Sequence, residues 1–234
     1  MKKHSIAFVL LLMLTVNLSA QGPSPKPLRL GIGLLAAGYA GDLTVNSHPF
    51  ERFSAGASLS LQFASEKLIS PQLNGGFGKF SAQDRDIAAV EGVQPNTFVE
   101  TPFFFVDLRI KARFLRETGF NPYISAGIGM LGFTPRDGMG NSLLDNYSTR
   151  QEGETYGSIT ANFPLSAGFE VKLGPILLVG LEYTYRVTTT DYLDNISALG
   201  QKEGNDNLQS ILLSLGLTFD PDHLFDTPLR GRDR

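Results

Sequence analysis

The chain has 234 residues, of which 42% are hydrophobic and 18% charged, with 25 glycines, no cysteine and no tryptophan. The lack of cysteine excludes disulfide scaffolds, cysteine-ligated zinc or iron–sulfur sites, thiol catalysis and a lipid-modified N-terminal cysteine. A net charge of −3 argues against a nucleic-acid partner, because nucleic-acid binding requires a concentrated basic surface. The mean hydropathy of −0.02, taken alone, is typical of a soluble protein.

Residues 1–20 have the three-part layout of a secretory signal peptide. A basic start at residues 1–4 precedes an apolar run at 6–14, and the segment then turns small and polar up to Ala20. Residues 21–27 contain three prolines and predict an extended linker, because proline excludes helix and central strand. We therefore expect export through the Sec pathway. No later stretch approaches the ~20 consecutive apolar residues of a membrane-spanning helix.

The rest of the chain alternates between apolar and polar residues with a period of two, which predicts strands. Over residues 53–63, every odd position is Phe, Ala or Leu, and the positions between are Ser, Gly or Gln; residues 208–219 repeat the pattern. No helix of ordinary length fits. The expected strands cover residues 28–40, 53–63, 68–80, 101–114, 121–133, 161–173, 175–188 and 208–219.

The connections between these strands alternate in length. Short connections at 64–67, 115–119 and 172–175 alternate with long polar ones at 41–52, 81–100, 134–160 and 189–207. Outer-membrane barrels have this asymmetry, with tight periplasmic turns and long external loops, and strands of ~9–11 residues suffice to cross that membrane. The predicted fold class is an all-β, eight-stranded, antiparallel up-and-down transmembrane β-barrel over residues 28–219, followed by a periplasmic tail at 220–234.

A soluble, lipocalin-like barrel also alternates with period two, but it points its apolar face inward. Three features favour the membrane: aromatic residues near the strand ends, a polar face built from small residues, and a last strand that ends at an aromatic residue on the short-turn side. The aromatic residues are Phe63, Phe114 and Phe219 at the lower rim and Phe53, Phe104, Phe163 and Tyr185 at the upper rim. The small residues include Gly31, Gly33, Gly56, Gly76 and Gly78.

Charged residues occur on the polar face of three strands and are expected to line the lumen. Isolated charges in a confined lumen are costly, so they should pair with one another. We expect an ion-pair network that plugs the barrel, with a selective ion pathway as the functional alternative. The predicted members of the ion-pair network are Asp107, Arg109, Lys111, Glu170, Glu182 and Arg186.

The sequence offers little material for catalysis or for a metal site. His48, with a loop serine and an aspartate, could imitate a catalytic triad, but no spacing supports this, and a solvated loop histidine is the simpler interpretation. Loop acids such as Asp84 and Asp86 could hold calcium, yet no EF-hand spacing is present. Asx turns and solvation explain the loop acids, which also include Asp137, Asp145, Asp191, Asp194, Glu203 and Asp206. We therefore predict no catalytic residue, cofactor or metal.

Two loop motifs carry a family resemblance. Gly41 and Asp42 follow a glycine-rich opening strand, and Asp191, Tyr192, Leu193 and Asp194 follow an aromatic strand. With these motifs, the chain resembles the small outer-membrane barrels of Bacteroidota, especially the PorG-like barrel component of the type IX secretion system. The resemblance implies a place in the outer membrane and a periplasmic lipoprotein ring as partner.

The function expected from the sequence is a non-enzymatic outer-membrane anchor or scaffold for an envelope assembly. Its long loops at 134–160 and 189–207 would face outward, and its tail, with Arg230, Arg232 and Arg234, would offer a basic segment to a periplasmic partner. The alternative is a small channel or a transporter of hydrophobic ligands, which a polar lumen would suit. A lipid-modifying barrel enzyme is a third hypothesis, and it depends on His48 alone.

Overall fold

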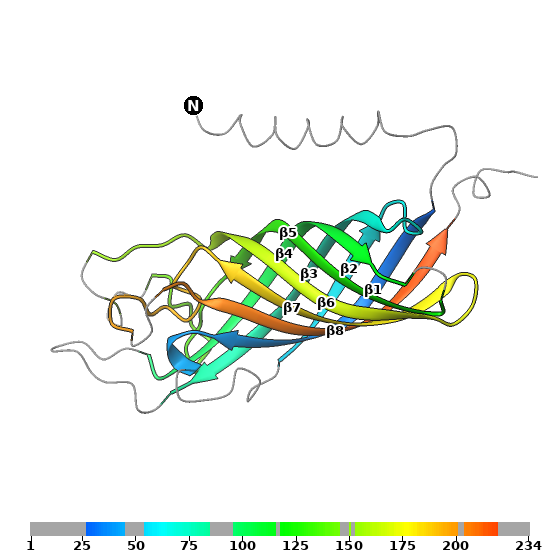
Figure 1. Ribbon diagram of the computed structural model, residues 1–234. Helices are drawn as coiled ribbons and strands as arrows, with labels where there is room; N and C mark the ends of the chain where they lie inside the picture. Colours follow the sequence, from blue (N-terminus) through cyan, green and yellow to red (C-terminus); the bar gives the residue numbers. More distant parts are fainter. Residues whose placement is uncertain are drawn as a thin grey trace, which may run out of the picture.

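Eight antiparallel strands form one closed barrel in which each strand pairs with its sequence neighbours and β1 pairs with β8 (Figure 1). The computed structural model describes residues 27–44, 54–84, 96–115, 118–145, 150, 153–200 and 204–219. The strands are β1 (Leu28–Ala40), β2 (Ser54–Gln62), β3 (Ile69–Gln83), β4 (Phe98–Arg113), β5 (Phe120–Phe133), β6 (Ile159–Lys172), β7 (Leu177–Thr188) and β8 (Asn207–Phe219). A short 3-10 helix, η1 (Asp42–Thr44), follows β1.

The predicted fold class is confirmed, and the strand positions differ from expectation mainly at the ends. β3 and β4 extend beyond the expected residues 68–80 and 101–114 at the end of the barrel that carries the long loops. The extension has a physical cause, because Phe80 and Val99 there are fully buried in an apolar core. Among the described residues, no helix is long and apolar enough to cross a membrane.

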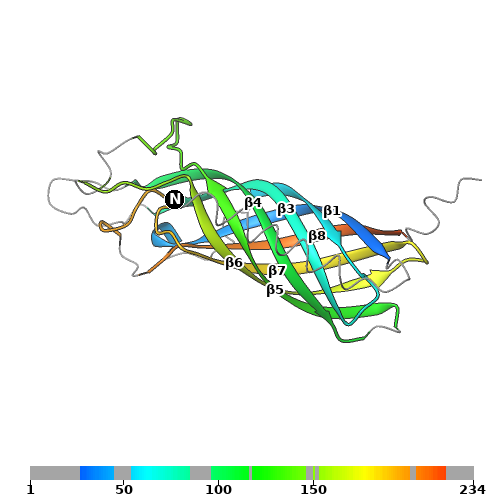
Figure 2. The ribbon, with the colours of Figure 1, turned by 90° about the horizontal axis from the view of Figure 1, so that it is seen from above.

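The two ends of the barrel differ. The start of β1, the end of β8 and the short connections lie at one end, and the longer loops lie at the other (Figure 1). We call these the short-turn end and the long-loop end. The strands are strongly tilted, as Figure 2 shows from above, and closing a sheet into a barrel requires such tilt.

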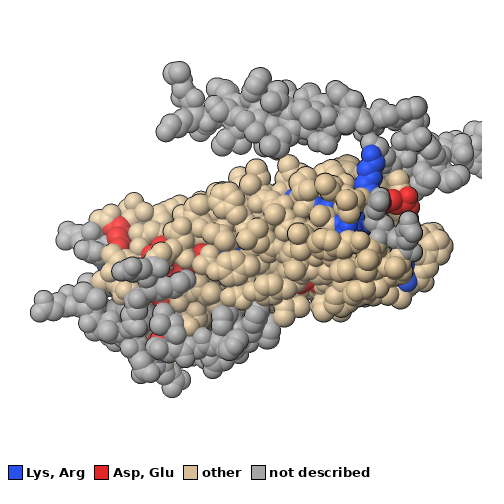
Figure 3. All heavy atoms as spheres, in the orientation of Figure 1, with Lys and Arg blue, Asp and Glu red and all other residues tan. Residues whose placement is uncertain are grey.

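The outer face of the barrel is apolar. Along β4, buried and exposed side chains alternate, and the exposed ones include Phe104, Val106, Leu108 and Ile110. Leu34 in the middle of β1 is 71% exposed. Figure 3 shows few charged side chains on the middle of this surface, with Lys and Arg appearing mostly toward the short-turn end and Asp and Glu mostly toward the other. A soluble barrel would bury this apolar face, so the lipocalin-like alternative is wrong.

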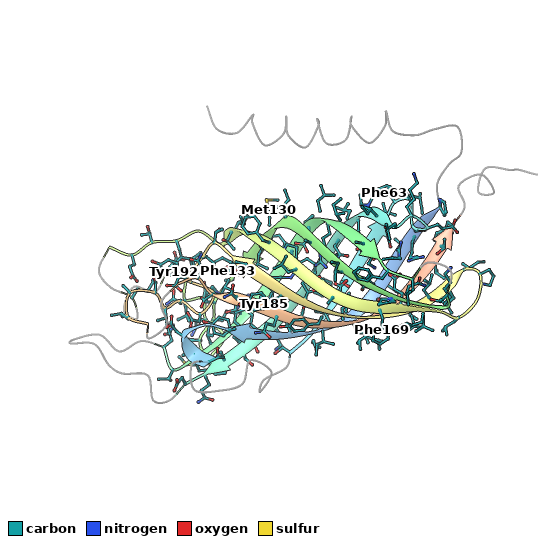
Figure 4. All side chains as sticks on the ribbon, viewed as in Figure 1. Phe63, Met130, Phe133, Phe169, Tyr185 and Tyr192 are labelled. Atoms are coloured by element: carbon teal, nitrogen blue, oxygen red, sulfur yellow. The ribbon has the colours of Figure 1, made fainter. Side chains whose placement is uncertain are left out.

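The expected aromatic rims lie on the same outer face. Four of the seven predicted rim residues are well exposed, and Tyr185 and Phe219 are half-buried. The exposed four are Phe63, Phe104, Phe114 and Phe163; Phe53 lies outside the described residues. Figure 4 shows Phe63, Met130 and Phe169 pointing away from the barrel.

A charge placed on the outer face in the middle of a strand tests whether this face contacts lipid. We expect Leu34→Arg to destabilise the barrel in lipid vesicles by about 2–4 kcal/mol, because the guanidinium would face hydrocarbon. Urea titration read by gel mobility before and after boiling measures the change. The control is Met139→Arg, since Met139 is 85% exposed in the loop after β5. Equal stability of the two variants would contradict a lipid-facing Leu34.

Candidate functional site

An ion-pair network occupies the middle of the lumen. Arg109 and Arg186 donate hydrogen bonds to Asp107 Oδ2 at 2.8 and 2.6 Å, and Arg109 also donates to Glu182 Oε1 at 2.9 Å. All four side chains are buried, and Asp107 has no exposed surface. Two positive and two negative charges balance, which is the arrangement that makes buried charge tolerable.

Strand geometry and two glycines place this network. Alternate residues of a strand point to one face, so Asp107 and Arg109 enter the lumen from β4, and residues of β7 meet them there. Gly127 and Gly129 are their register partners on β5. A Cβ at Gly129 would lie 2.3 Å from Asp107 Oδ1, and one at Gly127 would lie 2.9 Å from Arg109 Cγ. Glycine therefore leaves the room that the network needs.

A second cluster lies nearer the short-turn end, around Glu170. Glu170 accepts hydrogen bonds from three cations: Arg29 at 2.9 Å, Lys111 at 2.5 Å and Arg113 at 3.3 Å. The Lys111 ammonium also lies 3.7 Å from the centre of the Tyr123 ring. The Tyr123 hydroxyl donates to Glu182 at 2.8 Å, so this side chain links the two clusters.

The structure thus brings together the six residues predicted for the lumen network. Two further cations, Arg29 and Arg113, were not among the predicted members of the network. The signal for Arg29 was available, because Arg29 has the same strand parity as Gly31 and Gly33, which were expected to face the lumen.

The long-loop half of the lumen is filled by aromatic rings, which the sequence analysis did not foresee. The Arg186 guanidinium lies 3.7 Å from the centre of the Phe105 ring. From there, ring centroids follow at 6.5 Å to Phe103, 6.3 Å to Phe80 and 4.9 Å to Tyr39. We call these four rings the aromatic column. Phe103, Phe105 and Asp107 are alternate residues of β4 and point to the same side, into the lumen. The lumen face of β4 therefore changes from apolar to charged along the strand.

Above the aromatic column lies a cluster of three buried aspartates from separate segments. Asp42 belongs to η1, and Asp194 and Asp206 belong to the β7–β8 loop. One carboxylate oxygen from each lies within 4.8 Å of the others. Among the described residues, no cationic side chain forms an ion pair with Asp194 or Asp206. The cluster could hold a divalent cation, because such ions prefer carboxylate oxygens, or it could retain protons.

The Tyr39 hydroxyl contacts two carboxyl groups of this cluster. It lies 2.7 Å from both Asp194 Oδ2 and Asp206 Oδ1. A phenol has one proton to donate, so a protonated carboxyl that donates to the phenol oxygen would satisfy both contacts. Burial, with the charge of Asp42, raises the pKa of Asp194 from 3.8 to about 7. Burial, with the charge of Asp194, raises the pKa of Asp206 well above its usual range.

The two family-like motifs meet at this cluster. Gly41 lies so close to Tyr39 and Asp206 that a Cβ would be 1.6 Å from the Tyr39 hydroxyl oxygen, which explains a glycine before Asp42. Leu193 is fully buried among the apolar residues of the long-loop end. Tyr192 stacks on Tyr156 with centroids 4.4 Å apart (Figure 4 labels Tyr192). Asp191 lies half-buried at the start of the same segment.

The expectation that the loop acids are solvated is wrong for three of them. Asp194 and Asp206 have no exposed surface, because the β7–β8 loop folds into the mouth of the barrel and carries its acids with it. Asp84, directly after β3, is 8% exposed. Asp137, in contrast, is an exposed turn residue that accepts the backbone N–H groups of Met139 and Asn141. Several other predictions lie outside the described residues: residues 1–20, most of the linker, His48, Asp86, Glu203 and the tail at 220–234.

The raised pKa values predict a pH dependence of stability. A carboxyl group with a raised pKa in the folded state binds its proton more tightly there than in the unfolded chain. The contribution of this cluster to stability is therefore greatest at acidic pH and is lost as pH rises from about 4 to 7, by up to roughly 4 kcal/mol for Asp194 alone. We expect Asp194→Asn to flatten this decline, measured by urea unfolding between pH 4 and pH 8.

Asp137→Asn is the matched control, because Asp137 is exposed and its turn hydrogen bonds lower its pKa. An Asp194→Asn variant that keeps the full wild-type decline would contradict a shared proton at this cluster.

The chain was compared with curated protein sequences and with solved structures. No match is found among curated protein sequences. Among solved structures, Ail, the attachment invasion locus protein of Yersinia pestis, is similar with 11% identity and a TM-score of 0.48, over 83% of this chain and 99% of Ail. OprG from Pseudomonas aeruginosa has 9% identity and a TM-score of 0.48, over 85% and 98%. The N-terminal barrel of OprF from the same organism has 13% identity and a TM-score of 0.44, over 84% and 99%.

The family is shown by a sequence model that spans the whole barrel and extends toward the N-terminus. The model for the outer membrane protein beta-barrel domain matches residues 6–219. Membership of this family implies a location in the outer membrane. The chain belongs to the outer membrane protein beta-barrel domain family.

Proposed function

We propose that this protein is a non-enzymatic, non-conducting anchor in the outer membrane that holds an envelope assembly through its two ends. The observation that carries the proposal is the filled lumen. The Glu170 cluster, the ion-pair network, the aromatic column and the aspartate cluster follow one another along the barrel. A barrel filled in this way offers its ends, and not its interior, to other molecules.

The lumen is poorly suited to ion conduction. Arg109 and Arg186 are almost completely buried, and both are held by hydrogen bonds to carboxylates on the opposite walls. The cavity between Tyr123, Glu170 and Glu182 measures about 30 Å³, and one water in the liquid takes up about 30 Å³. Eight strands leave an interior that side chains just fill. The channel alternative therefore has no open path through the described lumen to support it.

A transporter of hydrophobic ligands would need apolar space that leads through the wall or along the axis. The apolar part of the lumen is instead occupied by Phe80, Phe103 and Phe105, which are packed against one another. A ligand path there would require these rings to move. The filled lumen thus favours the anchor over both forms of the alternative.

The finer form of the proposal concerns the partner. The family-like motifs at Gly41–Asp42 and 191–194 support a role like that of the PorG-like barrels of Bacteroidota, in a type IX-like secretion complex with a periplasmic lipoprotein. In this form, the short-turn end faces the periplasm, as it does in outer-membrane barrels, and Arg230, Arg232 and Arg234 at the end of the tail provide a basic contact.

Electrical recording tests the closed lumen. Reconstituted in a planar bilayer, the wild-type barrel should give no single-channel steps. Glu182→Ala should lower the free energy of unfolding by about 3–5 kcal/mol, because it leaves buried Arg109 without one carboxylate. Gel mobility before boiling verifies that each sample is folded. Wild-type steps that disappear in Glu182→Ala would instead identify the charges as an ion pathway and refute the plug.

Capture from native membranes tests the anchor. A tagged full-length chain, solubilised in mild detergent, should retain periplasmic proteins, and a deletion strain should secrete less protein. Arg230→Ser, Arg232→Ser and Arg234→Ser together should weaken the capture and leave the folded barrel intact. Recovery of the barrel alone, with normal secretion in the deletion strain, would contradict the proposal.

A further inference from the structure

The short-turn end of the lumen contains a polar cavity that the anchor role does not use. The cavity measures about 310 Å³, which falls at the lower end of the range for small-molecule sites. Its lining includes Arg29, Arg113 and Lys172 as cations and Glu66 and Glu170 as acids. These side chains come from β1, β4, β6 and the β2–β3 turn, so the closed barrel brings them together.

The charge around this cavity is not balanced. Arg29, Lys111 and Arg113 share one carboxylate, that of Glu170. Lys111 lies behind Glu170 and lines the adjoining smaller cavity near Tyr123. These four side chains carry three positive charges and one negative charge, a net charge of +2, and all four are buried. At the mouth, Lys172 and Glu66 cancel each other. The network in the middle of the lumen is neutral, so the excess belongs to this end alone.

Two polar atoms in the cavity lining have no hydrogen-bond partner among the described residues. They are Arg113 Nη2 and Ser65 Oγ, and both are buried. Arg113 Nη1 donates to the Ser65 carbonyl, so the two residues are held next to each other. An unsatisfied buried guanidinium nitrogen is costly, because it has lost its hydrogen bonds to water and gained none in the protein. A ligand in the cavity that accepts hydrogen bonds and carries negative charge would offer both side chains a partner.

We propose that this cavity binds a phosphate-like dianion at the periplasmic mouth of the barrel. Arginine donates in a planar fork that matches phosphate oxygens, and Arg113 and Ser65 both line the cavity. A charge of −2 on the ligand equals the excess of the cluster. The phosphate group belongs either to a free anion in the periplasm or to the phosphate monoester headgroup of a lipid such as phosphatidic acid in the inner leaflet.

Titration of inorganic phosphate into the folded barrel in an uncharged detergent tests the site by calorimetry, with chloride at equal ionic strength as reference. The expected result is saturable binding of one phosphate per barrel. Arg113→Gln should weaken the binding about tenfold or more, the size of one charge-assisted hydrogen bond. Ser65→Ala should weaken it less and keeps the test valid if Arg113→Gln does not fold.

Glu170→Gln supplies a test in the opposite direction. It removes the competing carboxylate, so phosphate should bind more tightly, a gain that misfolding cannot produce. The control is Lys79→Gln, because Lys79 is an exposed cation paired with Glu100 elsewhere on the barrel. Its binding should equal that of the wild type.

A lipid arm distinguishes the two sources of phosphate. The barrel is placed in phosphatidylcholine vesicles with or without phosphatidic acid, and phosphorus NMR measures an Arg113-dependent shift. Binding of inorganic phosphate assigns a free anion, whereas a shift with phosphatidic acid and no binding of inorganic phosphate assigns a headgroup. The proposal is overturned if neither probe binds to the wild type or Glu170→Gln, or if Arg113→Gln and Ser65→Ala bind as well as the wild type.

Discussion

Asp107 is fully buried in the centre of the barrel and accepts hydrogen bonds from Arg109 and Arg186. Closure of eight strands forces every second side chain into a narrow space, where an unpaired charge is costly. The middle of the lumen therefore requires carboxylates opposite the arginines and glycines beside them. Gly127 and Gly129 on β5 meet that second requirement. The balanced centre thus depends on residues that three different strands, β4, β5 and β7, bring together.

The lumen divides charge along its length. The centre is neutral, the short-turn end has two more cations than acids, and the long-loop end holds three aspartates beside Tyr39. The excess charge at each end can be neutralised by a different species. Carboxyl groups can take up protons, whereas an arginine cannot lose one. Arg29 and Arg113 therefore keep their charge, and an added anion can offset it, so the two ends call for different ligands.

Much of the fold follows from sequence because the period of two and the alternation of loop lengths are local signals. The apolar face around Leu59 and the small residues of the opposite, polar face together predicted that the apolar face contacts lipid on the outside of the barrel. The pairing of Glu170 with Arg29 was not readable, because it depends on the closure of β1 onto β8. The burial of Asp194 was missed for a related reason. The loop folds inward because Leu193 is buried in the apolar core, and its neighbour Asp194 is buried with it.

The same interior also shapes the surface that partners would meet. Tyr39 is fixed by stacking on Phe80 inside the barrel, and its hydroxyl holds Asp194 and Asp206 of the β7–β8 loop. Thr101 on β4 donates to the Leu193 carbonyl at 2.7 Å and ties that loop to the opposite wall. The position of the loop is therefore set by strands and not by the loop alone. For an anchor this matters, because a contact surface that is already ordered loses less conformational entropy on binding.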